Sequence, residues 1–197
     1  MTMLSNTSKM PGKSISLSAE KCITGSKLVK VKGTVCEDCY ALKGAYRYPV
    51  VKNKMGERMA FFNASNFVPL MVMELNRTKS DYFRWFDSGD VQSTKMCLDI
   101  LDVCDKTPNK KHWIPTKEHK FWKDALKTRA LPDNVVLRFS AYMVDKAPSK
   151  NWQWSSAVVR DAKPYGHVCP APDQGGKCLT CRACWSRDVK TVSYHKH

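Results

Sequence analysis

The cysteines constrain this chain more than any other residue type, because seven of the nine fall in two tight groups. The N-terminal triad, C-x13-C-x2-C, consists of Cys22, Cys36 and Cys39, and the C-terminal set, C-P-x7-C-x2-C-x2-C-W, consists of Cys169, Cys178, Cys181 and Cys184. Thiolates this close in sequence converge on one point only when a bound ion or cluster occupies it. Soft sulfur ligands favour zinc, copper(I) or iron–sulfur clusters. The sequence therefore predicts that all seven are metal ligands.

The length of 197 residues allows one well-buried core. We expect a single domain over 1–197, built from a Cys-containing segment 1–50, a βα core 51–164 and a Cys-rich segment 165–197. The first residues lack the basic and apolar regions of a secretory signal. An odd number of cysteines suits ligands in a reducing compartment better than disulfides. We expect a cytoplasmic protein with no membrane partner.

Hydrophobic spacing predicts strands that alternate with helices. Over 53–76 it predicts two helices separated at Pro69, and Ser93 is expected to cap a helix over 94–104. Strands are expected at 83–89, 111–116, 134–140 and 155–160, with another helix at 118–128. This order indicates an α/β protein with parallel βα units, either a partial βα barrel or an open parallel sheet with helices. The Cys-rich N- and C-terminal segments are expected around an iron–sulfur site.

The C-terminal set carries the more specific metal signal. Two C-x2-C steps place three sulfurs on a tight loop, and Cys169 arrives from across the Gly175-Gly176 turn. Such runs are typical of iron–sulfur clusters, whereas a mononuclear zinc site more often uses paired C-x2-C knuckles separated by a longer loop. We expect a cluster here, with zinc as the alternative.

The N-terminal triad leaves one coordination position open for a protein residue, a water or a small ligand. An open position permits chemistry at the metal. The alternatives are a structural site closed by a residue from elsewhere, for example His167 or His195, or one metal centre shared by both groups of cysteines. The other two cysteines, Cys97 and Cys104, lie on one face of a predicted helix and are expected to be buried core thiols.

The chain is strongly basic, with a formal charge of +15 from 33 Lys and Arg against 18 Asp and Glu. Such a field attracts polyanions, of which nucleic acid is the leading candidate. Basic residues also alternate with aromatic residues, a composition that neutralises phosphates and stacks bases. We expect contacts with DNA or RNA from Lys27, Lys30, Lys32, Arg47, Lys111, Lys120, Lys123 and Arg187.

The order of the motifs resembles the phage protein family called gene product 88. The resemblance is carried by Lys9 to Ala19, Cys22, Cys36-Glu-Asp-Cys-Tyr-Ala41, Arg84 with Ser88-Gly-Asp90, and Cys169-Pro170 to Cys184-Trp185. Together these motifs span nearly the whole chain. The C-x2-C-Y-A segment and the strand ending in Ser-Gly-Asp also look like degenerate radical S-adenosylmethionine enzymes, whose partial βα barrels bind a three-cysteine 4Fe-4S cluster.

That resemblance implies that the N-terminal triad binds a cluster, that Ser88, Gly89 and Asp90 form a cofactor-side turn, and that the C-terminal set is an auxiliary site. One or two 4Fe-4S clusters are then expected. The usual C-x3-C-x2-C loop is stretched here to C-x13-C-x2-C, Ile23-Thr24 stands where Pro-Gly is usual, and Phe86 replaces a polar residue. These departures argue against S-adenosylmethionine binding. A phage family places the protein in the cytoplasm of an infected bacterial host.

Three functional hypotheses follow. The first, favoured by the charge, the small size and the stretched loop, is a phage iron–sulfur protein that binds nucleic acid, with a structural or redox-sensing cluster. The second is a radical S-adenosylmethionine-type enzyme that acts on a nucleic acid or nucleotide. The third is a zinc-binding nucleic-acid-binding protein. The sequence singles out no catalytic residue.

Overall fold

Eight strands form one open sheet in the computed structural model, which describes residues 2–196. The strands are β1 (Ser5–Asn6), β2 (Lys13–Ile15), β3 (Tyr82–Trp85), β4 (Lys111–Thr116), β5 (Val135–Ser140), β6 (Trp154–Val159), β7 (His167–Val168) and β8 (Thr191–His195). Their order is β1-β2-β3-β4-β5-β6-β8-β7, and every neighbouring pair is parallel except β1 with β2. The sheet is therefore mixed, and its strands come from all three segments of the sequence.

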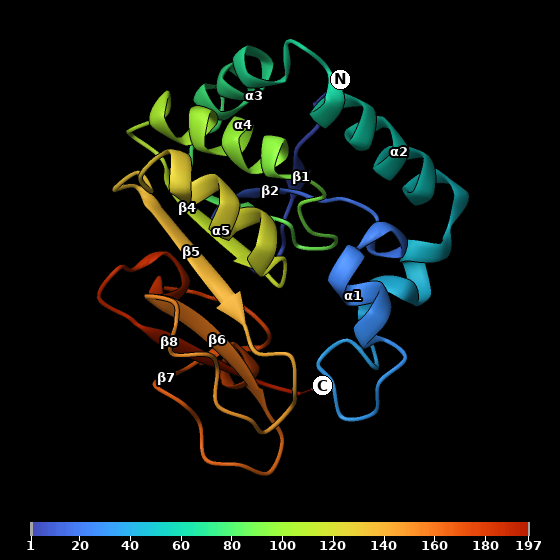
Figure 1. Cartoon of the computed structure of the whole chain (residues 1–197), viewed down its shortest axis with the longest axis vertical. Coiled ribbons are helices and arrows are strands. Elements are labelled where there is room, and N and C mark those ends of the chain that lie inside the picture. The colour runs from blue at the N-terminus through green and yellow to red at the C-terminus, as the bar shows by residue number, and fades with distance from the viewer. Residues whose placement is uncertain (1, 197) are drawn as a thin grey trace.

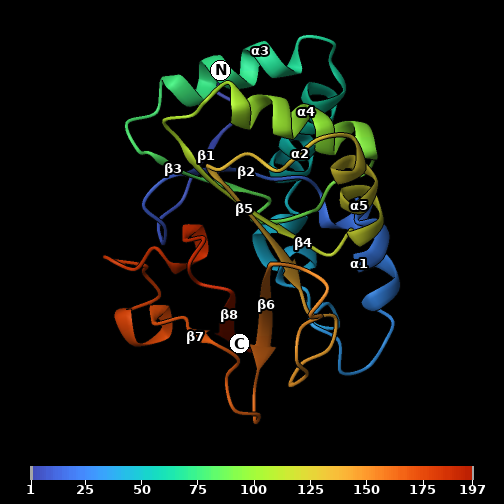
Figure 2. The ribbon, with the colours of Figure 1, turned by 60° about the vertical axis from the view of Figure 1, so that its left-hand side comes forward.

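Five α-helices accompany the sheet: α1 (Ile23–Leu28), α2 (Pro49–Asn63), α3 (Phe67–Asn76), α4 (Thr94–Asp105) and α5 (His119–Thr128). Helices α3, α4 and α5 lie on one face, and the C-terminal segment lies on the other (Figures 1 and 2). From β2 to β6 the parallel strands follow one another without a reversal of direction, as in βα barrels. No helix within residues 2–196 is long and apolar enough to cross a bilayer.

The main core fills the space between the sheet and helices α3 to α5. Trp85, Ile114 and Leu137 point from the strands to this side, where Met71 and Ile100 of the helices meet them. Cys97 and Cys104 of α4 are fully buried in the same core, which confirms that they are core thiols. Burial of so many large apolar groups is the main force that holds the helical layer against the sheet.

The opposite face of the sheet is covered by the C-terminal segment through a short 3₁₀ helix, η5 (Ala183–Trp185). The fully buried Arg138 guanidinium of β5 donates hydrogen bonds at 2.8 to 3.2 Å to six backbone carbonyls, five of them between residues 183 and 190. Trp185 packs edge-to-face on Trp113, with ring centroids 5.2 Å apart. Trp185 also donates from its indole N–H to the Phe83 carbonyl at 2.8 Å. This segment therefore closes the second face.

Most of the predicted elements are confirmed, including β4, β5, β6 and α5, and α4 begins after a Ser93 cap that accepts from Met96 N–H at 3.1 Å. Two details were wrong. The break between α2 and α3 falls at 64–66 rather than at Pro69, because a proline in the first turn of a helix lacks only an N–H that has no partner there. Strand β3 ends at Trp85, since Phe86 adopts a left-handed φ of 53° that stops the strand.

Candidate metal centres

The N-terminal triad lies at the edge of the sheet where the parallel strands end, which we call the carboxyl edge. Cys22 follows β2 after a short 3₁₀ turn, η1 (Ala19–Lys21), and directly precedes α1. The chain beyond α1 joins the loop after β5, where the Val35 N–H donates to the Tyr142 carbonyl at 2.8 Å. Cys36 therefore returns to the same edge, where parallel βα units gather their functional residues.

Two thiols of the triad face one point above Gly25 in α1. A methyl group built on Gly25 would lie 2.9 Å from Cys22 Cβ, 3.5 Å from Cys22 Sγ and 3.9 Å from Cys36 Sγ, so a larger residue at this position would crowd both cysteines. Cys39 follows in a tight turn, in which its N–H donates to the Cys36 carbonyl at 3.1 Å. The long interval in C-x13-C thus does not separate the sulfurs, because α1 folds within it.

The electrostatics of the triad favour a bound cation. Burial, followed by the negative charges of Asp90, the other two thiols and Glu118, raises the pKa of the Cys22 thiol to about 12. Burial also raises the pKa of Cys36, although the nearby cation of Lys117 acts against it. Thiolates in such surroundings need a positive partner, and a metal ion or cluster supplies one. The donor set therefore fits a metal centre.

Two buried carboxylates face the triad from the ends of β3 and β4. Asp90 accepts hydrogen bonds at 2.7 to 2.8 Å from the Thr116 hydroxyl and from two backbone N–H groups. Burial nevertheless raises the pKa of Asp90 to about 7. Glu118 accepts from both the N–H and the hydroxyl of Thr24, each at 2.7 Å. These bonds join the loop of Cys22 to the end of β4.

The Ser88-Gly89-Asp90 turn is fixed mainly to the end of β2. Ser88 Oγ donates to the Leu17 carbonyl at 2.9 Å, and the Leu17 N–H donates to the Ser88 carbonyl at 3.0 Å. Gly89 has a φ of 75°, and a Cβ on it would lie 2.6 Å from the Leu17 oxygen. Of the three residues predicted to bind a cofactor, Asp90 is the one that interacts with the triad; the roles of Ser88 and Gly89 in binding stay predictions.

The C-terminal set lines a cavity of about 20 Å³ on the other side of the sheet. All four cysteines of the set border it, as does His167 of β7, which sequence reasoning had not joined to this set. His167 Nε2 lies 3.6 Å from Cys181 Sγ, whereas Cys184 Sγ lies 3.1 Å from the Tyr194 hydroxyl. The H-x-C spacing of His167 and Cys169 is the sequence signal that identifies this histidine.

The two groups of cysteines are separate. Figures 1 and 2 both show α1 and β7 on opposite sides of the molecule, so the structure does not bring them to a shared centre. His167 lies with the C-terminal set, and His195 is the last residue of β8, paired with Val159. Across residues 2–196, no three His, Cys, Asp or Glu side chains already stand in positions to hold an ion, so binding at either site requires the thiols to rotate inward.

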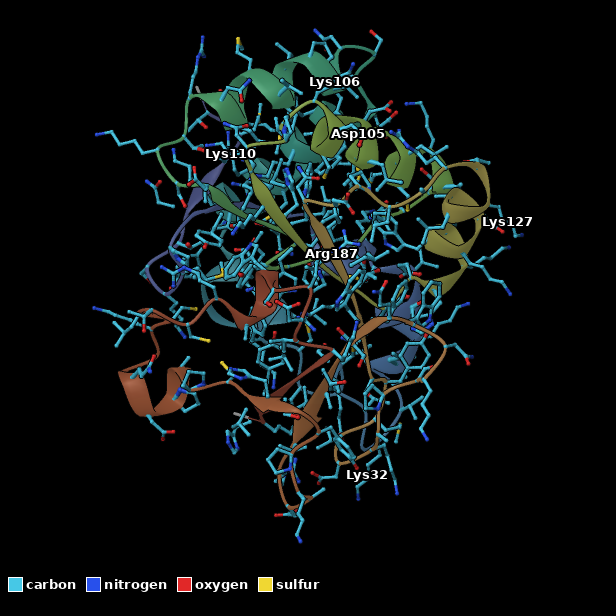
Figure 3. The ribbon with its side chains drawn as sticks, turned by 90° about the vertical axis from the view of Figure 1, so that its left-hand side faces the viewer. Lys32, Asp105, Lys106, Lys110, Lys127 and Arg187 are labelled. Carbon is cyan, nitrogen blue, oxygen red and sulfur yellow. The ribbon has the colours of Figure 1, made fainter. Side chains whose placement is uncertain are left out.

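The basic residues predicted to touch nucleic acid do not form one surface. Lys27 lies in α1, Lys30 and Lys32 follow it, and Lys120 and Lys123 lie in the first turns of α5. Figure 3 shows Lys32 at one end of the molecule and Lys106 and Lys110 at the other, and Lys110 directly precedes Lys111 of the predicted set. Lys111 begins β4 and therefore lies at the edge opposite the triad, and Arg47 lies in η3 (Gly44–Arg47).

Arg187 also lies away from the carboxyl edge, near the start of β5. Its guanidinium donates to the Pro132 carbonyl at 3.1 Å, forms an ion pair with Asp133 at 3.2 Å and sits 4.9 Å from the Trp154 ring centroid. In contrast, none of the ion pairs found within residues 2–196 involves Lys27, Lys30 or Lys32. Lys21, which directly precedes Cys22, is likewise absent from these ion pairs, so four lysines close in sequence to Cys22 carry no such partner.

Comparison with known proteins places this architecture in a family. The sequence model of the family described as "Gene product 88" matches residues 3–187, which is most of the chain. The chain belongs to the gene product 88 family. The match covers the N-terminal triad, the carboxyl ends of β2 to β6 and the C-terminal set, and it ends before β8. No curated protein and no solved structure matches the chain. Membership of the gene product 88 family therefore does not by itself specify an activity, and the two cysteine sites carry the chemical information.

Proposed function

We propose that this gene product 88 protein is an iron–sulfur protein of the radical S-adenosylmethionine type, acting on a nucleic acid or nucleotide. The N-terminal triad would hold one 4Fe-4S cluster and leave one iron without a protein ligand. Such a cluster, when bound, supplies the electron for reductive cleavage of S-adenosylmethionine.

The observation that carries this proposal is that Cys22 and Cys36 lie close together at the carboxyl edge. Their Sγ atoms are 3.5 and 3.9 Å from the position that a Cβ on Gly25 would occupy. The stretched C-x13-C-x2-C spacing, taken alone, argues against a cofactor-binding cluster. That objection loses its force because α1 takes up the interval and leaves the thiols together. A purely structural cluster has no need to lie at the edge where the strands of a βα sheet end.

The chain's own residues supply a defined environment there. Asp90, with a pKa near neutrality and 7% exposed, can hold or release a proton beside the site without losing its three hydrogen-bond donors. Glu118 fixes the loop of Cys22 through Thr24. Lys117 places a positive charge close to Cys36, where it offsets part of the negative charge. The three cysteines are half-buried among these loops, which limits the access of water to a bound cluster.

A second candidate is a non-catalytic iron–sulfur protein that binds nucleic acid. The specific observation in its favour is the group of Lys27, Lys30 and Lys32, which follow Cys22 and take part in none of the ion pairs of the described chain. Cations without carboxylate partners are available for phosphates. In the enzyme proposal the same lysines would bind the phosphates of a polynucleotide substrate.

The deciding experiment is anaerobic reconstitution with iron and sulfide, followed by reduction in the presence of S-adenosylmethionine. We expect about four irons bound by the triad and formation of 5′-deoxyadenosine. Cys36→Ser should lose the iron and the product. Cys104→Ala is the matched control, because its thiol is fully buried in the core and the charged groups that act on it are Asp105 and Arg129 rather than residues of the carboxyl edge.

The outcomes separate the candidates. Bound iron with no 5′-deoxyadenosine, together with oligonucleotide binding that weakens steeply with salt, would favour the non-catalytic protein. A folded, iron-free protein after reconstitution would overturn both candidates. Retention of all iron in Cys36→Ser would remove the triad from the site.

A further inference from the structure

Strand β7 and the residue that follows it place a histidine and a cysteine on the same side of the chain. His167 pairs with Val192 of β8, and the N–H of Cys169 continues the ladder by donating to the Ser193 carbonyl at 2.9 Å. Side chains two residues apart on an extended chain point to the same face. His167 and Cys169 thus offer a nitrogen and a sulfur donor on one face of the chain.

A C-x2-C turn faces this pair. In it the Cys181 N–H donates to the Cys178 carbonyl at 2.8 Å, and Leu179 adopts a left-handed φ of 42° that tightens the turn. The Cys178 N–H donates to the Lys9 carbonyl at 2.8 Å, which anchors the turn to the N-terminal segment. Tight C-x2-C turns are the sulfur-bearing knuckles of mononuclear zinc sites.

The three thiols and the imidazole lie close to one another around the cavity. Cys181 Sγ lies 3.6 Å from His167 Nε2. Burial, and then the charges of Cys169 and Cys181, raise the pKa of Cys178. Burial likewise raises the pKa of Cys169, while the Ala171 N–H acts against it by donating to the sulfur. Backbone N–H donors to a sulfur stabilise its thiolate form, which is the form that binds metal.

Cys184 is held differently, although it borders the same cavity. Its sulfur lies 3.1 Å from the Tyr194 hydroxyl, and its carbonyl accepts from Arg138 Nε at 3.1 Å. Both partners belong to the sheet, so Cys184 is directed toward the sheet rather than toward the C-x2-C turn. The thiol already has a polar partner in the folded chain.

We propose that His167, Cys169, Cys178 and Cys181 form a mononuclear zinc site, and that Cys184 is not a ligand. The cavity of about 20 Å³ has room for a body the size of one water molecule, which suits a single metal ion. Three sulfurs and one imidazole are a common tetrahedral zinc set. Binding releases the thiol protons and ties the loop 170–184 to the edge of the sheet. This site is independent of the cluster proposed at the N-terminal triad.

The test is cobalt(II) titration of the metal-free full chain, because the visible spectrum of cobalt reports how many thiolates bind it. In the Cys36→Ser background, where the N-terminal triad has lost a thiol, we expect one cobalt per chain, displaced by one zinc, with the spectrum of three sulfurs and one nitrogen. Cys181→Ser should weaken zinc binding by about 100-fold or more, since each ligand of a four-ligand site carries a large share of the affinity. Cys184→Ser, the matched control, should bind cobalt with an unchanged spectrum.

His167→Cys keeps four metal ligands, so it distinguishes a change of ligand from a loss of the fold. It should still bind one cobalt, now with the spectrum of four sulfurs. A four-sulfur spectrum in Cys36→Ser alone, or loss of cobalt in Cys184→Ser with retention in His167→Ala, would overturn the assignment. Iron and sulfide bound at this loop, retained in Cys36→Ser, would do so as well. Loss of iron but not zinc in Cys36→Ser would support the two sites separately.

Discussion

Glu118 binds Thr24 through both carboxylate oxygens, one to the backbone N–H and one to the hydroxyl, each at 2.7 Å. The pair joins the end of β4 to the start of α1, directly after Cys22. Glu118→Gln replaces one acceptor with a donor, so we expect a loss of roughly 1–2 kcal/mol in the free energy of unfolding and a lower iron content after reconstitution. Thr24→Val removes only the hydroxyl and should cost about half as much. Urea denaturation and iron analysis would check this, and an unchanged iron content in Glu118→Gln would contradict the role given to the pair.

Gly89→Ala should destabilise the protein, because the new Cβ would lie 2.6 Å from the Leu17 carbonyl oxygen and the residue has a φ of 75°. We expect a loss of about 2–3 kcal/mol. Gly56→Ala is the control within α2, where a Cβ meets nothing within 4 Å, and it should raise stability by about 0.5–1 kcal/mol. Thermal unfolding of the two variants side by side tests both signs.

Arg138→Met should remove the attachment of the C-terminal segment to the sheet. The variant leaves six backbone carbonyls without their donor, so we expect a loss on the order of 4 kcal/mol and early proteolysis between residues 183 and 190. Arg129→Met removes a more exposed arginine whose partners are Asp102 and Asp105, and should cost at most about 1 kcal/mol. Equal losses in the two variants would show that the buried carbonyls do not depend on Arg138.

Acid should destabilise the core through His112. Its Nδ1 accepts from Trp85 Nε1–H at 3.2 Å, so the ring proton lies on Nε2, which is 2.9 Å from the Thr107 hydroxyl oxygen. Burial lowers the pKa of His112 to about 3 from an ordinary value of 6.5. The unfolded chain therefore binds the proton first, and stability falls as the pH drops from 6.5 toward 3. Between pH 7 and 4.5 we expect a loss of roughly 2–3 kcal/mol that is absent in His112→Gln. Parallel pH profiles of the two proteins would argue against it.

Replacement of Lys27, Lys30 and Lys32 by Gln should weaken oligonucleotide binding and flatten its salt dependence, by about 0.7 to 0.9 in the logarithmic slope for each phosphate that a lysine no longer neutralises. The matched control replaces Arg77, Lys79 and Lys106, which removes the same charge from the opposite edge of the sheet. Fluorescence anisotropy over a range of salt concentrations distinguishes them. Equal effects would mean that net charge, and not the carboxyl edge, governs binding.

The central βα units could be predicted because each strand is long enough to show its pattern. The apolar run of β5 and the Ser93 cap of α4 are local signals that survive folding. Strand β2 has three residues and β7 has two, which is too short for any periodicity, and both depend on pairing with distant strands. The two edge strands of the parallel part of the sheet, β2 and β7, therefore could not be predicted from the sequence.

The sequence predicted which cysteines make up each candidate site, but it did not predict where in the fold the sites lie. Spacing alone leaves the triad and the C-terminal set free to share one centre, because the sequence does not show that the triad lies at the carboxyl edge whereas the C-terminal set lies beside β7 and β8. Spacing also allows His167 to be a partner for the triad, and only the β7–β8 ladder places it beside Cys181. No local signal marks Glu118, since its partner Thr24 is 94 residues away.

The strand order of the sheet matches the direction in which a ribosome releases the chain, from β2 through β6. Each newly emerged strand finds its neighbour already in place, so the sheet can grow during translation without waiting for distant partners. The exception is β8, which follows β7 in the chain but enters the sheet between β6 and β7. Strand β8 thus completes the ladder that carries His167 and Cys169, and a nascent chain that stalls before Thr191 would hold the proposed zinc ligands without the strand that positions them.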